Sequence, residues 1–336
     1  MVRRAGWASD YKTRLKQGNE EADYYTIALD GTEYFNSTSI NCPACLQKRD
    51  REGKLHYYHC VVAATLVRAG SHRILPLDAE MVKNTDGAEK QDCEMNAGKR
   101  IVARLRSEHP QMKIILSGDD LYSHAPMIEQ CLANQMHFIF VAKPDSHKEL
   151  KDWVEDLQRL GEVEEGAWQE GPVSKRRYYR YRIARLVPIN SIRKVWVNFV
   201  EVWEMNKEGR QLYHNSWVTD LEVSRENVEQ IAAAGRSKWK IENEQFNVQK
   251  NHGYELEHNY GHGKKNLSEV FYLLNQLAFV THKIIERGDR LYQRCREGKI
   301  SLRELWNGLR TLMNKMLFES WAGLLEFWLC DDVPGS

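Results

Sequence analysis

Residues 114–129 read Ile-Ile-Leu-Ser-Gly-Asp-Asp-Leu-Tyr-Ser-His-Ala-Pro-Met-Ile-Glu. An apolar run ends at Gly118, and two carboxylates, Asp119 and Asp120, follow at once. A short apolar run bounded by glycine predicts a buried strand, and the residues after it lead into a predicted helix. The end of such a strand is where α/β proteins place ligands and catalytic groups. Two adjacent carboxylates there favour a cation, and Mg²⁺ is the usual candidate because it prefers oxygen ligands.

The composition is that of an ordinary globular protein. The chain has 336 residues, enough for about two domains. Its formal net charge is only +1, so any basic surface that binds nucleic acid must be local. The seven cysteines are scattered, the N-terminus carries no secretory signal, and no apolar run reaches the roughly 20 residues of a membrane span. We therefore expect a cytoplasmic protein with free thiols and no membrane contact.

The chain before residue 164 predicts an α/β sheet with helices on its faces. Residues 1–22 are polar and basic and predict a helix or a frayed arm. Residues 24–30 predict a strand that stops at Asp30-Gly31, so Asp30 becomes a further carboxylate at a strand end, with a plain hairpin turn as the alternative. The following order is strand, strand, helix, strand, helix, strand, helix, with strands near 59–67, 72–82, 114–118 and 137–142 and helices over 92–108 and 148–160.

Residues 164–222 predict an insertion of three or four antiparallel strands. Eight Lys or Arg and no acid lie between Ser174 and Lys194, and Arg176, Arg177 and Arg180 are among them. This basic strand with interleaved Tyr is suited to a phosphate backbone. A solvated sheet face with stacked Arg and Tyr is the alternative.

Residues 229–250 predict a basic helix, broken near Gly235, that carries Arg236, Lys238 and Lys250. Glu242 and Glu244 are two residues apart, so on a helix they point in different directions and only one can face a given site. One such Glu with Asp30 and Asp119 around two Mg²⁺ ions would suit phosphoryl transfer. An apolar helix is expected over 267–287, and one or two amphipathic helices over 302–329.

Cys42-Pro-Ala-Cys45, followed by His59 and Cys60, contains zinc-ligand residue types. The intervening loop is shorter than the usual separation of zinc ligands. His59 and Cys60 are neighbours on a predicted strand, so their side chains point to opposite faces and cannot easily ligate one ion. We favour a reduced loop beside a strand, with a structural zinc as the alternative.

Three motifs carry a resemblance to a known family. Leu29-Asp-Gly-Thr, Gly118-Asp-Asp-Leu-Tyr and Trp239-Lys-Ile-Glu, with the run over 251–264, resemble DDE-type transposases of bacterial or archaeal insertion sequences. The match spans about residues 24–285. It implies a ribonuclease-H-like mixed sheet with flanking helices, formed by 23–163 and 223–289, after an arm over 1–22. It also implies an antiparallel β insertion over 164–222 and a helical C-terminal segment over 290–336.

The resemblance assigns the three acids residue by residue. The family's first Asp falls on Asp30. Its second Asp precedes a Tyr by three positions, which selects Asp119 over Asp120 because Tyr122 sets the register. Its Glu follows Trp-x-Ile, which selects Glu242 over Glu244. These three acids are expected to bind the metal and to be catalytic.

The family's phosphate-contacting residues match less closely. The family often has a Tyr seven positions before the Glu, an Arg four before it and a Lys seven after it. Those positions here hold Gly235, Lys238 and Gln249. Arg236 and Lys250 lie next to them in the chain. DNA contacts are therefore expected from Arg236, Lys238 and Lys250, and from Arg176, Arg177 and Arg180 of the basic strand.

The implied activity is Mg²⁺-dependent DNA transposition, with Mn²⁺ able to substitute. Such an enzyme hydrolyses phosphodiesters at the element's ends and joins the freed 3′-hydroxyl to double-stranded target DNA. A homodimer on DNA, associated with the nucleoid, is expected. Two alternatives stay open: a nuclease of the same core that cuts without joining, and a truncated, non-catalytic DNA-binding remnant. Only 29 residues precede Asp30, where the family commonly has a helical end-recognition domain, so the basic insertion and the C-terminal helices are the candidates for that role.

Overall fold

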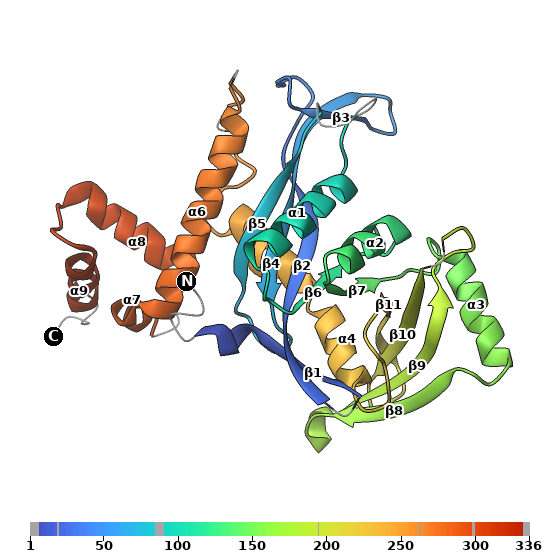
Figure 1. The fold of residues 1–336 in the computed structure, drawn as a ribbon. Coiled ribbons are helices and arrows are strands. Elements are labelled where there is room, and N and C mark those ends of the chain that lie inside the picture. The colour runs from blue at the N-terminus through green and yellow to red at the C-terminus, as the bar shows by residue number, and fades with distance from the viewer. Residues whose placement is uncertain are drawn as a thin grey trace. The chain divides into compact units, whose positions relative to one another are not determined.

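The structure of the chain is a computed structural model, shown in Figure 1. It describes residues 7–18, 20–84, 91–193, 195–259, 261–263, 265–297 and 300–331. The chain divides into two compact units, residues 1–245 and residues 246–336. Each unit is described by itself below.

One mixed sheet organises the first unit. Its strands are β1 (Lys12–Gln17), β2 (Glu20–Ser37), β3 (Leu46–Arg49), β4 (Leu55–Val67), β5 (Leu75–Val82), β6 (Ile114–Gly118), β7 (His137–Val141), β8 (Glu164–Glu170), β9 (Arg177–Pro188), β10 (Trp196–Met205) and β11 (Gln211–Thr219). Within the described residues, the eleven strands follow the order β3-β4-β2-β6-β7-β11-β10-β9-β8, while β1 pairs with β2 and β5 with β4. The pairs β2–β6 and β6–β7 are parallel, and the others are antiparallel.

Helices cover this sheet and make up the second unit. They are α1 (Glu94–Glu108), α2 (Ala125–Ala133), α3 (Lys148–Arg159), α4 (Val228–Arg236), α5 (Asn247–Asn251), α6 (Leu267–Gly288), α7 (Arg290–Cys295), α8 (Leu302–Lys315) and α9 (Trp321–Asp331). Short 3₁₀ turns span Trp7–Tyr11 and Val173–Lys175, and a π-helical segment spans Ile241–Phe246. The predicted mixed α/β class is confirmed. The predicted order of elements up to α3 is observed, with two strands, β1 and β3, that the sequence did not predict.

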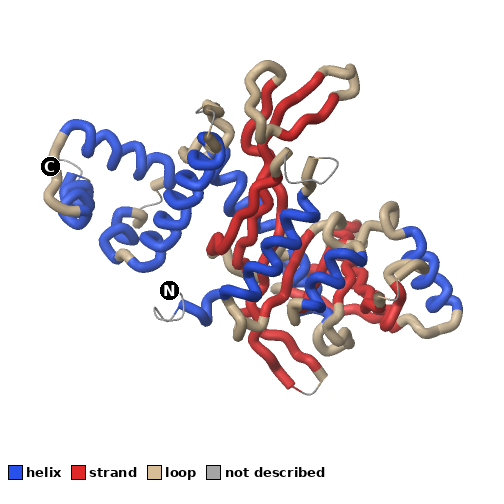
Figure 2. Tube along the Cα trace, turned by 45° about the horizontal axis from the view of Figure 1, so that its top comes forward, coloured by secondary structure: helices blue, strands red, loops and turns tan. Residues whose placement is uncertain are grey.

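Alternating side chains of the central strands build two apolar layers, one on each face of the sheet. Figure 2 traces the strands of the sheet in red and the helices in blue. Leu116 of β6 packs in a cluster that includes residues of α1, α2 and α3. Its neighbour Ile115 points to the other face and joins Ile231 of α4 in a second cluster. Because successive strand residues face opposite sides, one short apolar run supplies both layers. The fully buried strand β6 therefore contributes side chains to the apolar layers on both faces of the sheet.

The predicted turn at Asp30-Gly31 is wrong, because β2 continues through both residues to Ser37. Asp30 pairs with Ala63 and Gly31 with Val62 of β4, so the chain stays extended there. Gly31 is required for space: a Cβ built on it would lie 2.2 Å from Glu94 Oε2. Asp30 is thus an interior residue of a long strand rather than the end of a short one.

Two further segments differ from the sequence expectations. Residues 12–17, predicted as part of a helix or a frayed arm, form β1 and pair with the start of β2; residues 1–6 lie outside the described residues. The predicted insertion does form four antiparallel strands, but β11 pairs with β7 and so continues the sheet. The predicted helix over 229–250 is divided into α4, the π-helical segment and α5.

The second unit is helical, as the sequence predicts for its C-terminal part. Tyr292, Cys295, Leu305, Leu309, Leu324 and Leu325 form its buried cluster. The His282 ring stacks on Trp306 with 3.8 Å between centroids, and its Nδ1 lies 2.6 Å from the Tyr254 hydroxyl. Among the helices that the structure describes, none has the length and apolar character needed to cross a membrane.

Candidate active site

Asp30 and Asp119 lie opposite each other on neighbouring parallel strands. The β2–β6 register pairs Ala28 with Ser117, and two residues further along each chain lie Asp30, within β2, and Asp119, just past the end of β6. Adjacent strands are about 4.8 Å apart, and equivalent residues of a parallel pair face the same side. The strand end that the sequence predicts for Asp119 is confirmed, since β6 stops at Gly118. Asp30 reaches the same place from the middle of β2.

Glu242 joins these aspartates through Lys238, which follows α4. The Lys238 Nζ lies 3.1 Å from Asp30 Oδ2 and 2.6 Å from Glu242 Oε1. Only 12% of the Lys238 side chain is exposed, so its ammonium is held inside the group. The segment that carries Glu242 is π-helical, an irregularity often found at functional sites. Gln245, in the same segment and fully buried, bonds to the Thr65 hydroxyl of β4 and fixes the segment to the sheet.

Glu94 is a fourth carboxylate in this group, and sequence reasoning missed it. It is the first residue of α1, and its carboxylate lies directly over Gly31. Burial raises the pKa of Glu94, and the negative charge of Asp119 adds to the shift. The signal available in the sequence was a Glu at the predicted start of a helix, a position that the helix dipole favours but that many surface helices share. We name Asp30, Glu94, Asp119 and Glu242 the acidic cluster.

Within the acidic cluster, the Asp30 carboxyl has a strongly raised pKa. Burial raises the pKa of Asp30 to about 7. The Lys238 ammonium opposes this shift, and the charges of Glu242 and Asp119 increase it. Lys238 in turn has a raised pKa, because the two carboxylates outweigh its burial. A strongly shifted carboxylate beside several others and one buried cation is typical of a functional site.

The acids next to the selected ones point elsewhere. Asp120 accepts hydrogen bonds from the Lys143 amide at 2.6 Å and from the Ser146 hydroxyl, so it anchors the loop after β7. Glu244 accepts from His72 Nδ1 at 3.1 Å, away from Lys238. Only Glu242 of these two glutamates contacts Lys238 in the acidic cluster, in line with the expectation that they point in different directions. The structure brings together the same three acids that the resemblance selects.

Asp120, His124 and His147 form a second group whose ligand atoms lie within 4.8 Å of one another. Asp120 is engaged with the loop as described, and His147 Nε2 lies 2.6 Å from the Ser123 hydroxyl. Burial lowers the pKa of His147, which keeps this imidazole neutral and able to share a proton with Ser123. The hydrogen bonds of Asp120 and His147 account for this group as a structural network.

The predicted DNA-binding cations are divided between ion-paired positions and exposed ones. Lys238 lies within the acidic cluster, and Lys250 pairs with Glu257 at 2.7 Å in the second unit. Arg236 and Arg177 both approach Glu204, at 2.6 and 3.6 Å. Arg180 is exposed and Arg176 half-buried on the basic strand. Ion pairs with carboxylates also engage Arg182, Arg185 and Arg193, so the basic strand carries less uncompensated charge than its sequence suggests.

Comparisons with known proteins do not assign the chain to a family. A scan against models of protein families finds none that matches the chain, and a search among curated proteins finds no similar protein. Function must therefore be inferred from the residues of the site.

An aromatic pocket of about 460 Å³ lies between the inserted strands and α4. Trp168 and Tyr179 stack along its wall with ring centroids 4.7 Å apart. The Arg236 guanidinium lies 4.2 Å from the Tyr213 ring centroid, and Lys240 Nζ lies 4.7 Å from that of Trp239. Aromatic faces beside cations are the combination on which nucleic-acid bases stack.

Gly235 takes the place where the resembling family often has Tyr, and the structure gives a reason. A Cβ built on Gly235 would lie 2.6 Å from Trp217 Nε1 and 2.9 Å from Ile139 Cγ2. Trp217 is fully buried and cannot move aside. The close approach of α4 to β7 and β11 therefore depends on glycine at this position.

We expect Gly235→Ala to destabilise the protein by about 1–3 kcal/mol, the usual range for overpacking a core. The measurement is urea denaturation followed by circular dichroism. Gly323→Ala in α9 is the control, because its new Cβ would meet nothing closer than 3.4 Å. That change should be neutral or stabilising by up to about 1 kcal/mol, the helix propensity of Ala over Gly. Equal effects of the two substitutions would contradict the steric explanation.

Proposed function

We propose that this protein is a metal-dependent DNA transposase. The observation that carries the proposal is the convergence of Asp30, Asp119 and Glu242, which come from β2, the end of β6 and the segment after α4. Asp30 is buried, Asp119 is half-buried and Glu242 is exposed, and three like charges brought together from distant parts of the chain oppose folding. Their convergence is explained if they act together on a cationic or phosphate-bearing substrate complex.

The topology supports a ribonuclease-H-like core for this proposal. Three antiparallel strands, β5, β4 and β2, are extended by the parallel strands β6 and β7, with α1 and α2 between successive strands. The inserted strands follow before Glu242, as the resemblance implies. Asp30 lies on β2 and Asp119 directly follows β6, the two strands at which the antiparallel part of the sheet meets the parallel part.

The donor set fits Mg²⁺. The cluster offers carboxylate oxygens, which hard divalent cations prefer, and Asp30, Asp119 and Glu242 would hold the ions. The buried Lys238 ammonium already balances Asp30 and Glu242, which indicates that the site requires positive charge. When bound, the metal would supply a lowered pKa of the attacking water or 3′-hydroxyl and stabilisation of the leaving oxygen.

The chain's own residues would position the DNA. Lys238 is the cation nearest the acids and could turn from them to a phosphate oxygen. Arg236, at the end of α4, lines the aromatic pocket and would hold the backbone while bases stack on the ring faces. Asp30, half-protonated near neutral pH, must lose its proton before it can serve as an anionic ligand.

The test incubates the protein with linear DNA that contains the gene for this protein and the natural sequence on both sides of that gene. After incubation with Mg²⁺, sequencing of the new 3′ ends and of joined products reports cutting and strand transfer. Defined cuts with joining are expected. Cutting without joining would replace the proposal with a nuclease, and tight binding without cutting would replace it with a DNA-binding remnant.

Calorimetric Mn²⁺ titration of Asp30→Ala, Asp119→Ala and Glu242→Ala, with duplex DNA present, should show weakened Mn²⁺ binding in all three variants.

The basic strand yields a separate prediction for binding. We expect the double variant Arg176→Gln/Arg180→Gln to flatten the slope of log affinity against log salt by about 2, since each lost phosphate contact removes about one unit. Titration of a generic duplex at several salt concentrations measures the slope. Lys151→Gln/Arg159→Gln in α3 removes the same charge from cations already paired with Glu155 and Asp156, and should leave the slope unchanged. An unchanged slope in the first variant would make the basic strand a plain solvated face.

A further inference from the structure

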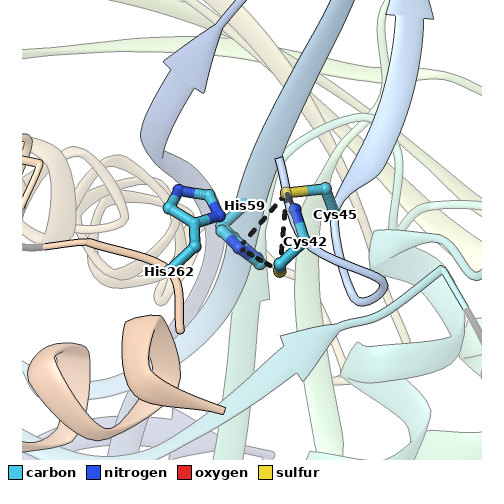
Figure 3. Close-up of side chains that lie close together, drawn as sticks. All are labelled: Cys42, Cys45, His59 and His262. Atoms are coloured by element: carbon cyan, nitrogen blue, oxygen red, sulfur yellow. Dashed lines mark hydrogen bonds between the residues drawn. The ribbon is translucent and has the colours of Figure 1, made fainter. Parts of the chain in front are cut away.

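Two thiols and an imidazole lie together at the base of the extension formed by β3 and the adjoining ends of β2 and β4. The Sγ atoms of Cys42 and Cys45 are 3.7 Å apart, and His59 Nε2 lies 3.4 Å from the first and 3.5 Å from the second. Figure 3 shows the two thiols and the His59 ring turned toward one another. Cys45 and His59 are buried, and Cys42 is partly so.

The backbone is built to hold this trio. Leu46 pairs with Tyr58, so one step back along β3 and one forward along β4 sets Cys45 opposite His59. A turn through Pro43 returns Cys42 to the same place, closed by a 3.0 Å hydrogen bond from the Cys45 amide to the Cys42 carbonyl. The Cys42 amide also donates to Cys45 Sγ at 3.3 Å, which fixes the position of that sulfur. Strand register, which the sequence could not supply, brings these residues together.

The distances match the edges of a zinc coordination tetrahedron. With Zn–S near 2.3 Å and Zn–N near 2.0–2.1 Å, tetrahedral geometry separates two sulfurs by about 3.8 Å and a sulfur from a nitrogen by about 3.5 Å. The three observed separations agree with these values within about 0.2 Å, the tolerance expected of a metal site. We propose that Cys42, Cys45 and His59 bind one zinc ion, with its fourth position filled from outside this trio.

A disulfide or a redox dithiol fits the trio less well than a metal does. The two sulfurs are 3.7 Å apart, well beyond the roughly 2.05 Å of a disulfide bond. A redox Cys-x-x-Cys has its reactive thiol activated by a helix N-terminus, whereas this pair is followed by a strand. Cys60 points to the opposite face of β4, where its Sγ lies 3.5 Å from Glu94 Oε1, so it belongs to the acidic cluster's surroundings. His59 and Cys60 do point to opposite faces of β4, as the sequence predicts for neighbouring strand residues. The proposed zinc site needs only His59, which faces the two thiols.

Zinc would stabilise an extension that has few apolar contacts of its own. Leu46 is the buried residue of β3, whereas Gln47, Lys48 and Arg49 are exposed, and so is the loop at 50–54. A metal bond between Cys45 and His59 would link β3 to β4 at the point where their pairing begins. This inference does not depend on the proposed transposase activity.

The first experiment measures zinc in the full chain purified without added metal, by mass spectrometry. About one zinc per chain is expected, and after chelation, Co²⁺ should restore binding with the absorption of a tetrahedral site that has two thiolates. Amide hydrogen exchange reports the structural effect: protection of β3 should rise with free zinc in the ratio 1 + [Zn]/Kd, about 100-fold at 100 times Kd. Less than about 0.1 zinc, and no thiolate–cobalt spectrum, would overturn the proposal.

Matched variants locate the site. Cys42→Ser and His59→Asn should lose zinc and the corresponding cobalt bands, while Cys93→Ser, an exposed cysteine away from the trio, should retain both. Cys60→Ser tests the neighbouring position and should also keep one zinc. If Cys42→Ser misfolds, alkylation of wild-type thiols settles the assignment, because zinc should protect Cys42 and Cys45 and leave Cys93 reactive. Zinc retained in both ligand variants, or no protection of these two thiols, would refute the assignment.

Discussion

Asp119→Asn should abolish metal-dependent DNA cleavage, with a rate reduced by at least about 10³-fold, whereas Asp120→Asn should keep most of it. The loss corresponds to about 4 kcal/mol of transition-state stabilisation, the several kcal/mol that a catalytic metal site supplies. Asp119 lies opposite Asp30 and contributes to the raised pKa of that carboxyl. Asp120 instead accepts bonds from the Lys143 amide and the Ser146 hydroxyl on its two different oxygens. In Asn the amide oxygen can still accept from Lys143, and the NH2 group can donate to the Ser146 hydroxyl oxygen.

Two measurements make this comparison decisive. Cleavage of the gene-flanking DNA in Mg²⁺ reports activity, and calorimetric Mn²⁺ titration reports whether the metal still binds. Urea denaturation controls for folding, since Asp120→Asn weakens loop contacts and should cost about 1 kcal/mol of stability. If Asp120→Asn were the inactive variant, the register set by Tyr122 would be wrong and the acidic cluster would need another second aspartate.

The sequence predicted Asp119 well because its signal is local. An apolar run that ends in glycine is enough to locate a buried strand, and β6 stops where predicted. Asp30 was selected by resemblance and then placed in the wrong local structure. Its Asp-Gly pair is a turn signal, but pairing with Ala63 and Val62 keeps β2 extended. Long-range pairing outweighed the local preference here.

Other parts of the site depend on contacts that no local pattern encodes. Glu94 reaches the cluster only because α1 packs over Gly31, which lacks the Cβ that would exclude it. Lys238 was expected to contact phosphate, and it lies between Asp30 and Glu242 instead. The Cys42–Cys45–His59 trio follows from the register of β3 on β4. Each of these contacts arises from tertiary packing or strand register. The sequence had marked the chemistry of Lys238 and of the Cys42–Cys45–His59 trio, but it gave no specific signal for Glu94.

The second large effect concerns the pH dependence of stability without metal. The usual Asp pKa of 3.8 applies to the unfolded chain, and burial raises the pKa of Asp30 in the folded protein to about 7. Between these values the folded protein binds more protons than the unfolded chain, so its stability falls as pH rises. One group changes the free energy of unfolding by at most about 1.4 kcal/mol per pH unit. Below about pH 4 the effect is absent, and above about pH 7 it is complete.

Asp30→Asn removes this titration. In EDTA, the stability of the variant relative to wild type should improve by about 2–3 kcal/mol between pH 5 and pH 8, measured by urea denaturation at each pH. Glu242→Gln is the matched control within the cluster, and it should keep the downward slope because Asp30 remains. Mg²⁺ should restore wild-type stability at pH 8 and leave Asp30→Asn little changed. A relative stability that does not change with pH would mean that Lys238 fully compensates Asp30, and the acidic cluster would then be a structural ion-pair network rather than a site held ready for a divalent cation.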